Sequence, residues 1–527
     1  MRLQSRFSDA CRLSSGVTWA VLALGVASGI YVWFATHLHG LGTTRDGMVF
    51  VSAARSLIAG EGFAHPDGTP MTLWPPGYSF MLALGGWITD PYAAGRGLHA
   101  ITMVLLVLCV DAWLRSSNCS GHTRLGAAAV MTTSIPLTWL AAQVRSELVF
   151  ILWTTVGLAF LSAYVRAPSR RTAQATGGAF LAAVLTRYMG IAAVVAALVL
   201  IVGFSSTSWR RRLEDAAWAT VPSVIGGGAW LVRNQWVSGT TTGGRIPSPD
   251  RLLENIDRLV QVIALWVLPD EVAAGIRDGI GILLLAGLIG GAIAVYGVAV
   301  YRSPQYVRRR LGIHGIVSIT YAALYAGALL AATTLYASDR LNGRLASPLF
   351  VPGWVAAFAL GRALLNTVKH THRRWLRTTL IAVGCLWLLF PTALSGVRLH
   401  NMYTEGSGGF ATNRFVNTAT LQRAVANPDG CAHWVSNAPS LLYFQTGRVV
   451  QQSPRAVHQR TSVPASDLKP FHADLRAADE PICLVWFDAV SRPFLLSPDA
   501  LQAHVTLRVL SRHSDGTLYI VEHEKGL

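Results

Sequence analysis

The residue best placed to do chemistry is Asp46, which closely follows the first apolar block of the 527-residue chain. A carboxylate at the rim of a membrane-embedded cavity can act as a general base and take a proton from an attacking group. Asp46 also precedes an amphipathic stretch at 49–59, and an acid in that place is typical of a helix N-cap. Residue types alone favour the cap, and both interpretations stay open.

Arg187 and Glu147 are charged residues at the edges of apolar sequence. Arg187 divides a nearly continuous apolar stretch at 179–204 and predicts a tight turn between two membrane spans. An ionisable group at membrane depth usually faces a cavity or a partner, although a long arginine side chain can also reach the lipid headgroups. Glu147 opens an apolar block two residues after Arg145. It predicts either a salt bridge to Arg145 or Arg96, or a contact with substrate.

Arg340 and Arg344 stand just before an apolar block that begins at Leu345 and contains Pro348. Guanidinium groups in such a position can stabilise the negative charge that develops on a phosphate leaving group. Asp339 directly precedes them. Local pairing with this carboxylate is therefore an equally good interpretation.

The first loop also contains aromatic residues and a histidine. Trp74 and Tyr78 can stack on a sugar ring or guide a prenyl chain, but aromatic residues at this depth more often anchor a protein at the membrane interface. His65 has no second ligand at metal-binding spacing. The sequence therefore predicts no metal site, because protein metal ions are held by several ligands together.

The composition explains where these residues must lie. Hydrophobic residues make up 52% of the chain and charged residues only 13%, about half the charged share of a soluble domain. The formal net charge of +17 comes mostly from Arg and Lys in short loops, where they set membrane topology. This placement favours a membrane protein over one that binds nucleic acid.

Eleven apolar blocks are predicted to cross the membrane, with the N-terminus in the cytoplasm and the C-terminus outside. Basic loops at 115–124, 166–171, 210–212, 302–310 and 369–377 mark the cytoplasmic side, and the acidic loops mark the other. The short apolar segments 76–87 and 259–268 are predicted to be interfacial. The eleven blocks are 16–36, 93–114, 125–143, 148–165, 173–185, 189–204, 216–232, 279–301, 311–336, 345–364 and 376–397.

The composition changes after residue 400. Short β-branched and aromatic runs alternate with turn residues, which predicts a small extracytoplasmic α/β domain over 401–527. Cys431 and Cys483 lie in this domain and can form a disulfide if it is exported. The expected strands are 431–436, 441–444, 448–452, 482–487, 506–510 and 517–521, with a helical stretch at 413–426.

The loop at 37–92 resembles the first outer loop of the GT-C membrane glycosyltransferases. The resemblance is carried by Asp46-Gly47, Arg55, the Gly60-Glu61-Gly62-Phe63 run and Trp74-Pro-Pro-Gly-Tyr78. It is closest to the bacterial protein-mannosyltransferase and aminoarabinose-transferase relatives. Weaker matches lie at 145–147, 186–188 and 340–348. Many relatives carry a second acid where this chain has Gly47, so a single base is left here.

The resemblance implies a mainly α fold: a polytopic bundle of about 11 spans over 1–400, with interfacial helices in the first outer loop. It implies transfer of a monosaccharide from a polyprenyl-phosphate-linked donor to a glycan, lipid or protein acceptor, at the outer face of a bacterial inner membrane. Asp46 would be the general base of an inverting single displacement, with no metal or other cofactor implied. Arg187, Arg344 and Arg340 would bind the donor phosphate. The substrate cavity would include Arg45, Glu61, His65, Trp74, Tyr78, Arg96 and Glu147.

Two alternatives come from other classes of membrane protein. An O-antigen ligase or polymerase usually places its large functional loop late in the chain, whereas this chain has it after the first span. A transporter would require charged residues near mid-bilayer and paired broken helices. The charges of this chain concentrate at one face, which favours a reaction cavity there.

Overall fold

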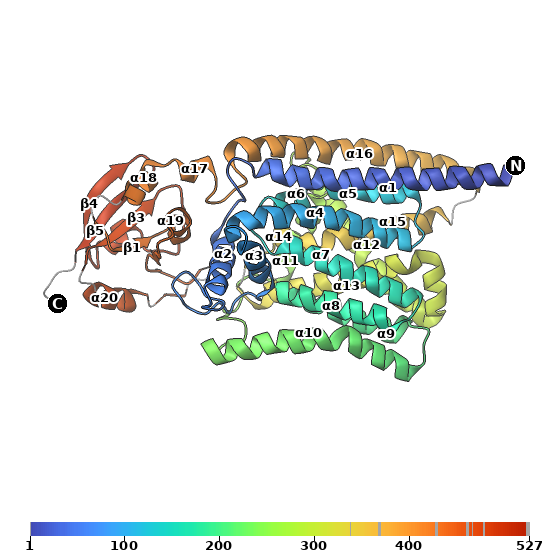
Figure 1. Cartoon of the computed structure of the whole chain (residues 1–527), viewed down its shortest axis with the longest axis horizontal. Helices are drawn as coiled ribbons and strands as arrows, with labels where there is room; N and C mark the ends of the chain where they lie inside the picture. The colour runs from blue at the N-terminus through green and yellow to red at the C-terminus, as the bar shows by residue number, and fades with distance from the viewer. Residues whose placement is uncertain are drawn as a thin grey trace.

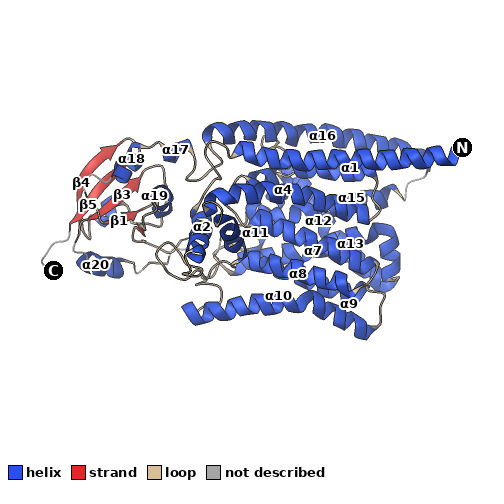
Figure 2. Ribbon diagram, in the orientation of Figure 1, coloured by secondary structure: helices blue, strands red, loops and turns tan. Residues whose placement is uncertain are grey.

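The chain forms a long helical bundle with a small α/β domain at one end (Figures 1 and 2). The computed structural model describes residues 2–337, 339–366, 370–426, 430–459, 463–465, 467–477 and 480–522. The last predicted basic loop begins at Lys369, which lies outside these residues.

The apolar blocks form the helices of the bundle, which run along the long axis of the molecule (Figure 1). Each satisfies its backbone hydrogen bonds internally, as a segment in lipid must. The bundle contains α1 (Arg2–Ala35), α4 (Pro91–Ser116), α5 (Gly121–Thr133), α6 (Ile135–Ala141), α7 (Glu147–Arg166), α8 (Arg170–Thr186), η1 (Tyr188–Gly190), α9 (Ile191–Phe204), α10 (Trp209–Ser238), α11 (Leu252–Ala264), α12 (Ala274–Tyr301), α13 (Pro304–Leu335), α14 (Gly343–Ala346), η2 (Ser347–Leu349), α15 (Phe350–Leu365) and α16 (His370–Glu405).

Seven helical segments among the described residues are long and apolar enough to cross a membrane, in α1, α4, α7, α12, α13, α14–α15 and α16. The other four predicted spans fall in α5, α8, α9 and α10. The first three of these have 13, 17 and 14 residues, and a helix needs about 20 to cross the hydrocarbon core. The predicted count of eleven is therefore not confirmed.

Two short helices of the first outer loop, α2 (Arg45–Ile58) and α3 (Gly77–Gly86), lie between the bundle and the small domain (Figure 1). They pack on each other through Phe50, Val51, Tyr78 and Leu82. With 10 residues, α3 is too short to span a membrane, as expected for segment 76–87. The second short segment lies in α11 and the turn that follows it.

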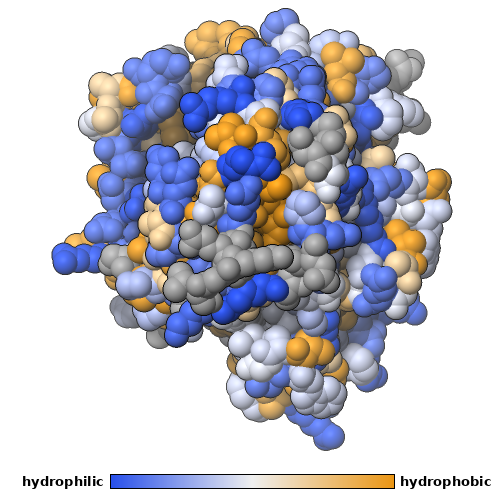
Figure 3. Space-filling model, turned by 90° about the vertical axis from the view of Figure 1, so that its left-hand side faces the viewer, coloured by the Kyte–Doolittle hydropathy of each residue, from blue (hydrophilic) through white to orange (hydrophobic). Residues whose placement is uncertain are grey.

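The C-terminal domain is a five-stranded sheet with strand order β2-β1-β3-β5-β4. β1 pairs in parallel with β2 and β3, and the β3–β5 and β5–β4 pairs are antiparallel. Seen from this end, the molecule is largely hydrophilic (Figure 3). The elements are α17 (Asn413–Val416), α18 (Ala419–Ala426), β1 (His433–Ser436), α19 (Pro439–Thr446), β2 (Gln451–Gln452), α20 (Leu468–Ala477), β3 (Ile482–Phe487), α21 (Pro498–Leu501), β4 (Thr506–His513) and β5 (Gly516–Glu522).

Three predictions about this domain can be compared with its structure. Cys431 and Cys483 form the expected disulfide, which joins the start of β1 to β3. The strand predicted at 441–444 is wrong, because these residues form α19 between a proline at its N-terminus and the left-handed Gly447 at its C-terminus. The bundle also continues past residue 400, since α16 ends at Glu405.

Candidate functional site

Two backbone segments hold the residues just before α2 in place. Gly42 donates to the carbonyl of Ala142 at 2.8 Å, and its own carbonyl accepts from Val144 at 2.9 Å. On the other side, Phe410 donates to the carbonyl of Thr43 at 2.7 Å. A side chain at Gly409 would meet that carbonyl at 1.9 Å. The linker between α16 and the domain therefore helps to fix Thr43, two residues before α2.

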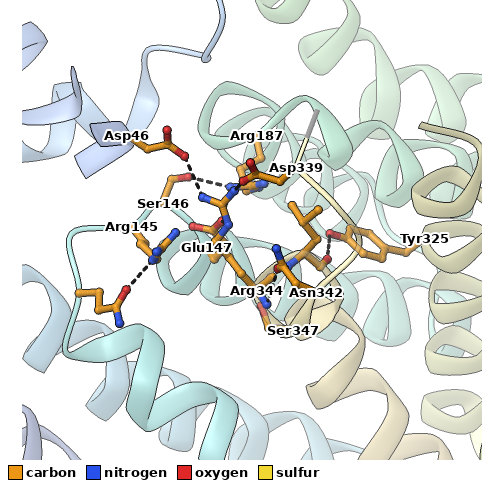
Figure 4. Close-up of polar contacts among 12 residues, drawn as sticks. Asp46, Arg145, Ser146, Glu147, Arg187, Tyr325, Asp339, Asn342, Arg344 and Ser347 are labelled. Carbon is orange, nitrogen blue, oxygen red and sulfur yellow. Dashed lines mark hydrogen bonds and ion pairs between the residues drawn. The ribbon is translucent and has the colours of Figure 1, made fainter. Parts of the chain in front are cut away.

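Asp46 is the second residue of α2, and its carboxylate faces Arg344 rather than the helix backbone (Figure 4). The N-cap is Thr44, and no side-chain cap bond is made. Oδ2 of Asp46 accepts a hydrogen bond from Nη1 of Arg344 at 2.9 Å. The capping interpretation of Asp46 is therefore wrong.

Arg344 is the centre of the cluster in Figure 4. Oδ1 of Asn342 caps α14 by accepting from the backbone N–H groups of Arg344 and Leu345 at 3.0 and 3.2 Å. The Arg344 side chain is 12% exposed and pairs with Asp46 and Asp339. Its Nε also lies 3.4 Å from Oε1 of Glu147. One guanidinium thus serves three carboxylates.

Glu147 links Arg344 to Arg187. Its side chain is 2% exposed, and Oε1 lies 2.7 Å from Nη1 of Arg187. Arg187 follows α8 in extended conformation, at the expected tight turn, and donates to Oγ of Ser146 at 3.1 Å. The salt-bridge partners expected for Glu147, Arg145 and Arg96, are thus wrong. α7 and α8 instead bring Glu147 and Arg187 together.

Arg145 is a third cation in the cluster. Its Nε donates to Oε1 of Gln143 at 2.6 Å, and its guanidinium lies 5.1 Å from the centre of the Trp139 ring. Burial lowers the pKa of Arg145, and the like charge of Arg344 lowers it further. A positive charge held in this way favours an anionic ligand.

A cavity of about 880 Å³ opens beside Asp46 and Arg344. Its charged lining consists of five arginines and four acids: Arg45, Arg145, Arg340, Arg344, Arg398, Asp46, Asp270, Glu271 and Asp339. Its apolar lining comes mainly from α6, the region of α11, and α16: Ile135, Pro136, Trp139, Val262, Leu265, Trp266, Leu268, Pro269, Phe390 and Leu394. The cavity therefore offers both guanidinium groups and a large apolar surface to one ligand.

The phosphate-binding candidates divide into two groups. Arg344 and Arg340 line the cavity. Arg187 is not among the lining residues and reaches Arg344 through Glu147. The contacts of Arg187 with Glu147 and Ser146 are those of a residue that positions the ion cluster.

Of the predicted substrate-cavity residues, only Arg45 lines the cavity. Tyr78 is fully buried, contacts His99 at 2.8 Å, and has its pKa raised by burial. Trp74 packs edge-on against Phe50, and Arg96 lies over the ring of Trp33.

The remaining two predicted residues also lie elsewhere. Glu61 accepts from Oγ of Ser56. His65 packs against Trp74, and burial lowers its pKa. With Glu147 behind the cavity wall, these residues support the first loop and the ion cluster rather than line the cavity.

Most of the cavity lining was not among the predicted site residues, including the polar or aromatic residues Trp139, Arg145, Asp339 and Arg398. Arg145 and Asp339 lie within two residues of the predicted site residues Glu147 and Arg340. Their closeness in sequence could therefore have indicated that they belong to the site. Trp139 and Arg398 have no such signal. Among the described residues, no group of three His, Cys, Asp or Glu side chains is arranged to hold a metal ion.

Two solved structures of the glycosyltransferase ArnT share this architecture. ArnT from Cupriavidus metallidurans in the apo state matches with a TM-score of 0.58 and 15% identity over 96% of this chain and 98% of that one. ArnT bound to undecaprenyl phosphate matches with a TM-score of 0.56 and 15% identity, over 94% and 97%. The chain has the GT-C fold.

A third solved structure shares the fold. The Archaeoglobus fulgidus oligosaccharyltransferase in complex with Zn and sulfate matches with a TM-score of 0.50 and 12% identity, over 94% of this chain and 72% of that one. No protein-family model matches the chain, and no curated protein matches its sequence. These identities show the fold alone, so function must be argued from the site.

Proposed function

We propose that the chain transfers a monosaccharide from a polyprenyl-phosphate-linked donor to an acceptor at the outer face of a membrane. The observation that carries the proposal is the contact between Asp46 and Arg344 in the lining of a cavity that also has many apolar residues. A prenyl phosphate sugar has the same division between an anionic head and a hydrocarbon tail. Undecaprenyl phosphate bound to a chain of the same fold supports this choice.

The donor phosphate would bind Arg344, Arg340 and Arg145, and the prenyl chain would follow Trp266, Phe390 and Leu394. Phosphate oxygens match the fork of a guanidinium well. On binding, the phosphate would compete with Asp46 and Asp339 for Arg344. The proposal therefore includes an exchange that frees the Asp46 carboxylate as the donor arrives.

Asp46 would then take the proton of the acceptor hydroxyl or amine as that group attacks the anomeric carbon. The new bond forms on the face opposite the phosphate, the bond from the anomeric carbon to the phosphate oxygen breaks, and the configuration inverts. The phosphate leaves with the bonding electron pair, and its added charge is stabilised by the arginines. Glu147 is a poor base, because it is buried between two arginines; it would hold Arg187 and Arg344 in place.

The proposal includes an orientation and a location. The N-terminus would be cytoplasmic, and the α/β domain would lie in the periplasm of a bacterium. A disulfide in that domain agrees with an oxidising compartment. Acceptors would be glycans, lipids or proteins, with no nucleic acid and no required metal, so treatment with EDTA is expected to leave turnover unchanged.

Asp46→Asn tests the proposal. Membranes with the wild-type protein should consume a radiolabelled polyprenyl-phosphate sugar, and the variant should do so about 10²- to 10⁴-fold more slowly at equal folded amounts. Asp67→Asn is the matched control, because Asp67 is an exposed acid of the same loop that hydrogen-bonds Thr69. Equal turnover by the Asp46 variant would remove Asp46 as the base. No consumption by any variant across several donors would favour a transporter or an O-antigen ligase or polymerase.

A further inference from the structure

A second, smaller pocket lies between α2 and the C-terminal domain. Its volume is about 240 Å³, enough for one sugar-sized group and too small for a larger ligand. Arg45, which directly precedes Asp46 in the chain, lines both this pocket and the large cavity. The other lining residues come from the domain: Gln451, Gln452, Arg455, Gln459, Asp467 and Phe494.

The charges of this pocket are not balanced. Asp467 neutralises Arg455 through hydrogen bonds of 2.6 and 3.1 Å. Arg45 lines the pocket, whereas Arg492 is not among the lining residues and stands two positions before Phe494, which is. Neither arginine donates a side-chain hydrogen bond or forms an ion pair within the described part of the chain. Burial and the like charge of Arg45 lower the pKa of Arg492 to about 10. Two neighbouring guanidinium groups therefore lack an anion.

The uncharged lining is suited to hydroxyl groups. The side-chain amides of Gln452 and Gln459 make no hydrogen bond within the described residues, so each offers both donors and an acceptor. Phe494 adds one aromatic side chain. No continuous apolar wall like that of the large cavity is present among these lining residues.

We propose that this pocket binds an anionic sugar of the acceptor, one that carries a phosphate or carboxylate, and directs a neighbouring acceptor group past Arg45 to Asp46. Arg45 and Arg492 would bind the anion, and the glutamines would bind sugar hydroxyls. This inference rests on the proposed transferase function. It assigns the C-terminal domain a role in choosing the acceptor, whereas the bundle binds the donor.

Equilibrium binding to the full-length protein in phosphatidylcholine nanodiscs tests this assignment without requiring turnover. The probes are glucose 1-phosphate and glucuronate, with neutral glucose for comparison. Wild-type protein should bind at least one anionic probe about tenfold or more tightly than glucose, and Arg492→Gln and Arg45→Gln should each weaken that binding about tenfold. Arg508→Gln should not, since Arg508 lies on β4, at the edge of the sheet opposite β2, and pairs with Glu522 of β5.

One further variant and a second lipid separate the possible sources of binding. Loss of binding in Arg344→Gln but not in Arg492→Gln would place the anion at the donor site and overturn the inference. Equal affinity for glucose and both anions would also overturn it. Displacement of the probe by phosphatidylglycerol in the nanodiscs would assign the pocket to a phospholipid headgroup instead. None of these results depends on donor consumption, so the Asp46→Asn assay would still decide the transferase proposal by itself.

Discussion

Two buried arginines of the bundle are used in opposite ways. Arg124 pairs with one carboxylate, Asp111, through bonds of 2.7 and 3.0 Å, and the two side chains are 8% and 6% exposed. Arg344 is almost as buried, at 12%, but is shared by three carboxylates and lines a cavity. Neither Arg124 nor Asp111 lines that cavity.

The difference lies in what each arginine can exchange. In a one-to-one bidentate pair, each charge is already neutralised by its partner within the fold. An anionic ligand would have to displace that partner completely in order to bind. A guanidinium with three carboxylate partners keeps two of its ion pairs when a phosphate replaces one carboxylate. Burial of an arginine is therefore a weak indicator of function, and the number of its partners beside an open cavity is a better one.

Removal of Arg124 should give the largest change in stability. Arg124→Gln leaves Asp111 buried without its counter-ion, so we expect a loss of about 3–5 kcal/mol in the free energy of unfolding. Denaturation of the detergent-solubilised protein by SDS measures this. Adding Asp111→Asn should recover part of the loss, and the remaining folded protein should keep its donor turnover. A normal unfolding curve for the single variant would show that the pair is not structural.

Arg344→Gln should instead affect activity. We expect donor turnover to fall about 100-fold, equivalent to about 2.7 kcal/mol, because the main phosphate ligand is removed. The unfolding curve should shift less than that of Arg124→Gln, since Asp46 and Asp339 line the cavity and the buried Glu147 keeps its ion pair with Arg187. Arg344→Lys should restore charge but not bidentate geometry, and so recover only a fraction of the turnover. If Arg344→Gln unfolds as readily as Arg124→Gln, the distinction between the two arginines fails.

Glu147→Gln should have an intermediate effect. The neutral amide no longer attracts Arg187 and Arg344. The arginines that bind the donor phosphate would then be less well aligned, although none of them is removed. Turnover should fall about tenfold, mainly in kcat, while KM for the donor changes little. Glu61→Gln is the matched control in the first outer loop. A rise in KM with unchanged kcat would indicate that Glu147 affects donor binding rather than alignment.

The sequence predicts the Asp46 end of the site better than its other walls. Asp46 and Arg344 could be selected because each stands beside a membrane-spanning block, but their 2.9 Å contact joins residues 298 positions apart. The local sequence pattern around either residue contains no information about a contact between two residues so far apart in the chain. Tyr78 was misassigned for the same reason: its position in the loop was clear, but the burial against Phe50 and His99 depends on how α2, α3 and α4 pack. Long apolar blocks were predictable because their length alone decides whether they can span lipid.

The pair of Arg455 and Asp467 extends the comparison to a partly exposed surface, where the smallest effect is expected. The hydrogen bond from Arg455 lowers the pKa of Asp467, so the folded state favours the ionised carboxylate. The pair therefore stabilises the domain at pH values above the ordinary carboxyl pKa of about 4, and this contribution disappears as the pH falls through the lowered value. The side chains are 37% and 28% exposed, which limits the contribution to about 1 kcal/mol or less.

Asp467→Asn should lower the Tm slightly at pH 7, and the difference from wild type should vanish in acid. A difference that persists in acid would mean that packing, rather than charge, stabilises this part of the pocket. A one-to-one ion pair would then contribute to stability only where it is buried, as at Arg124.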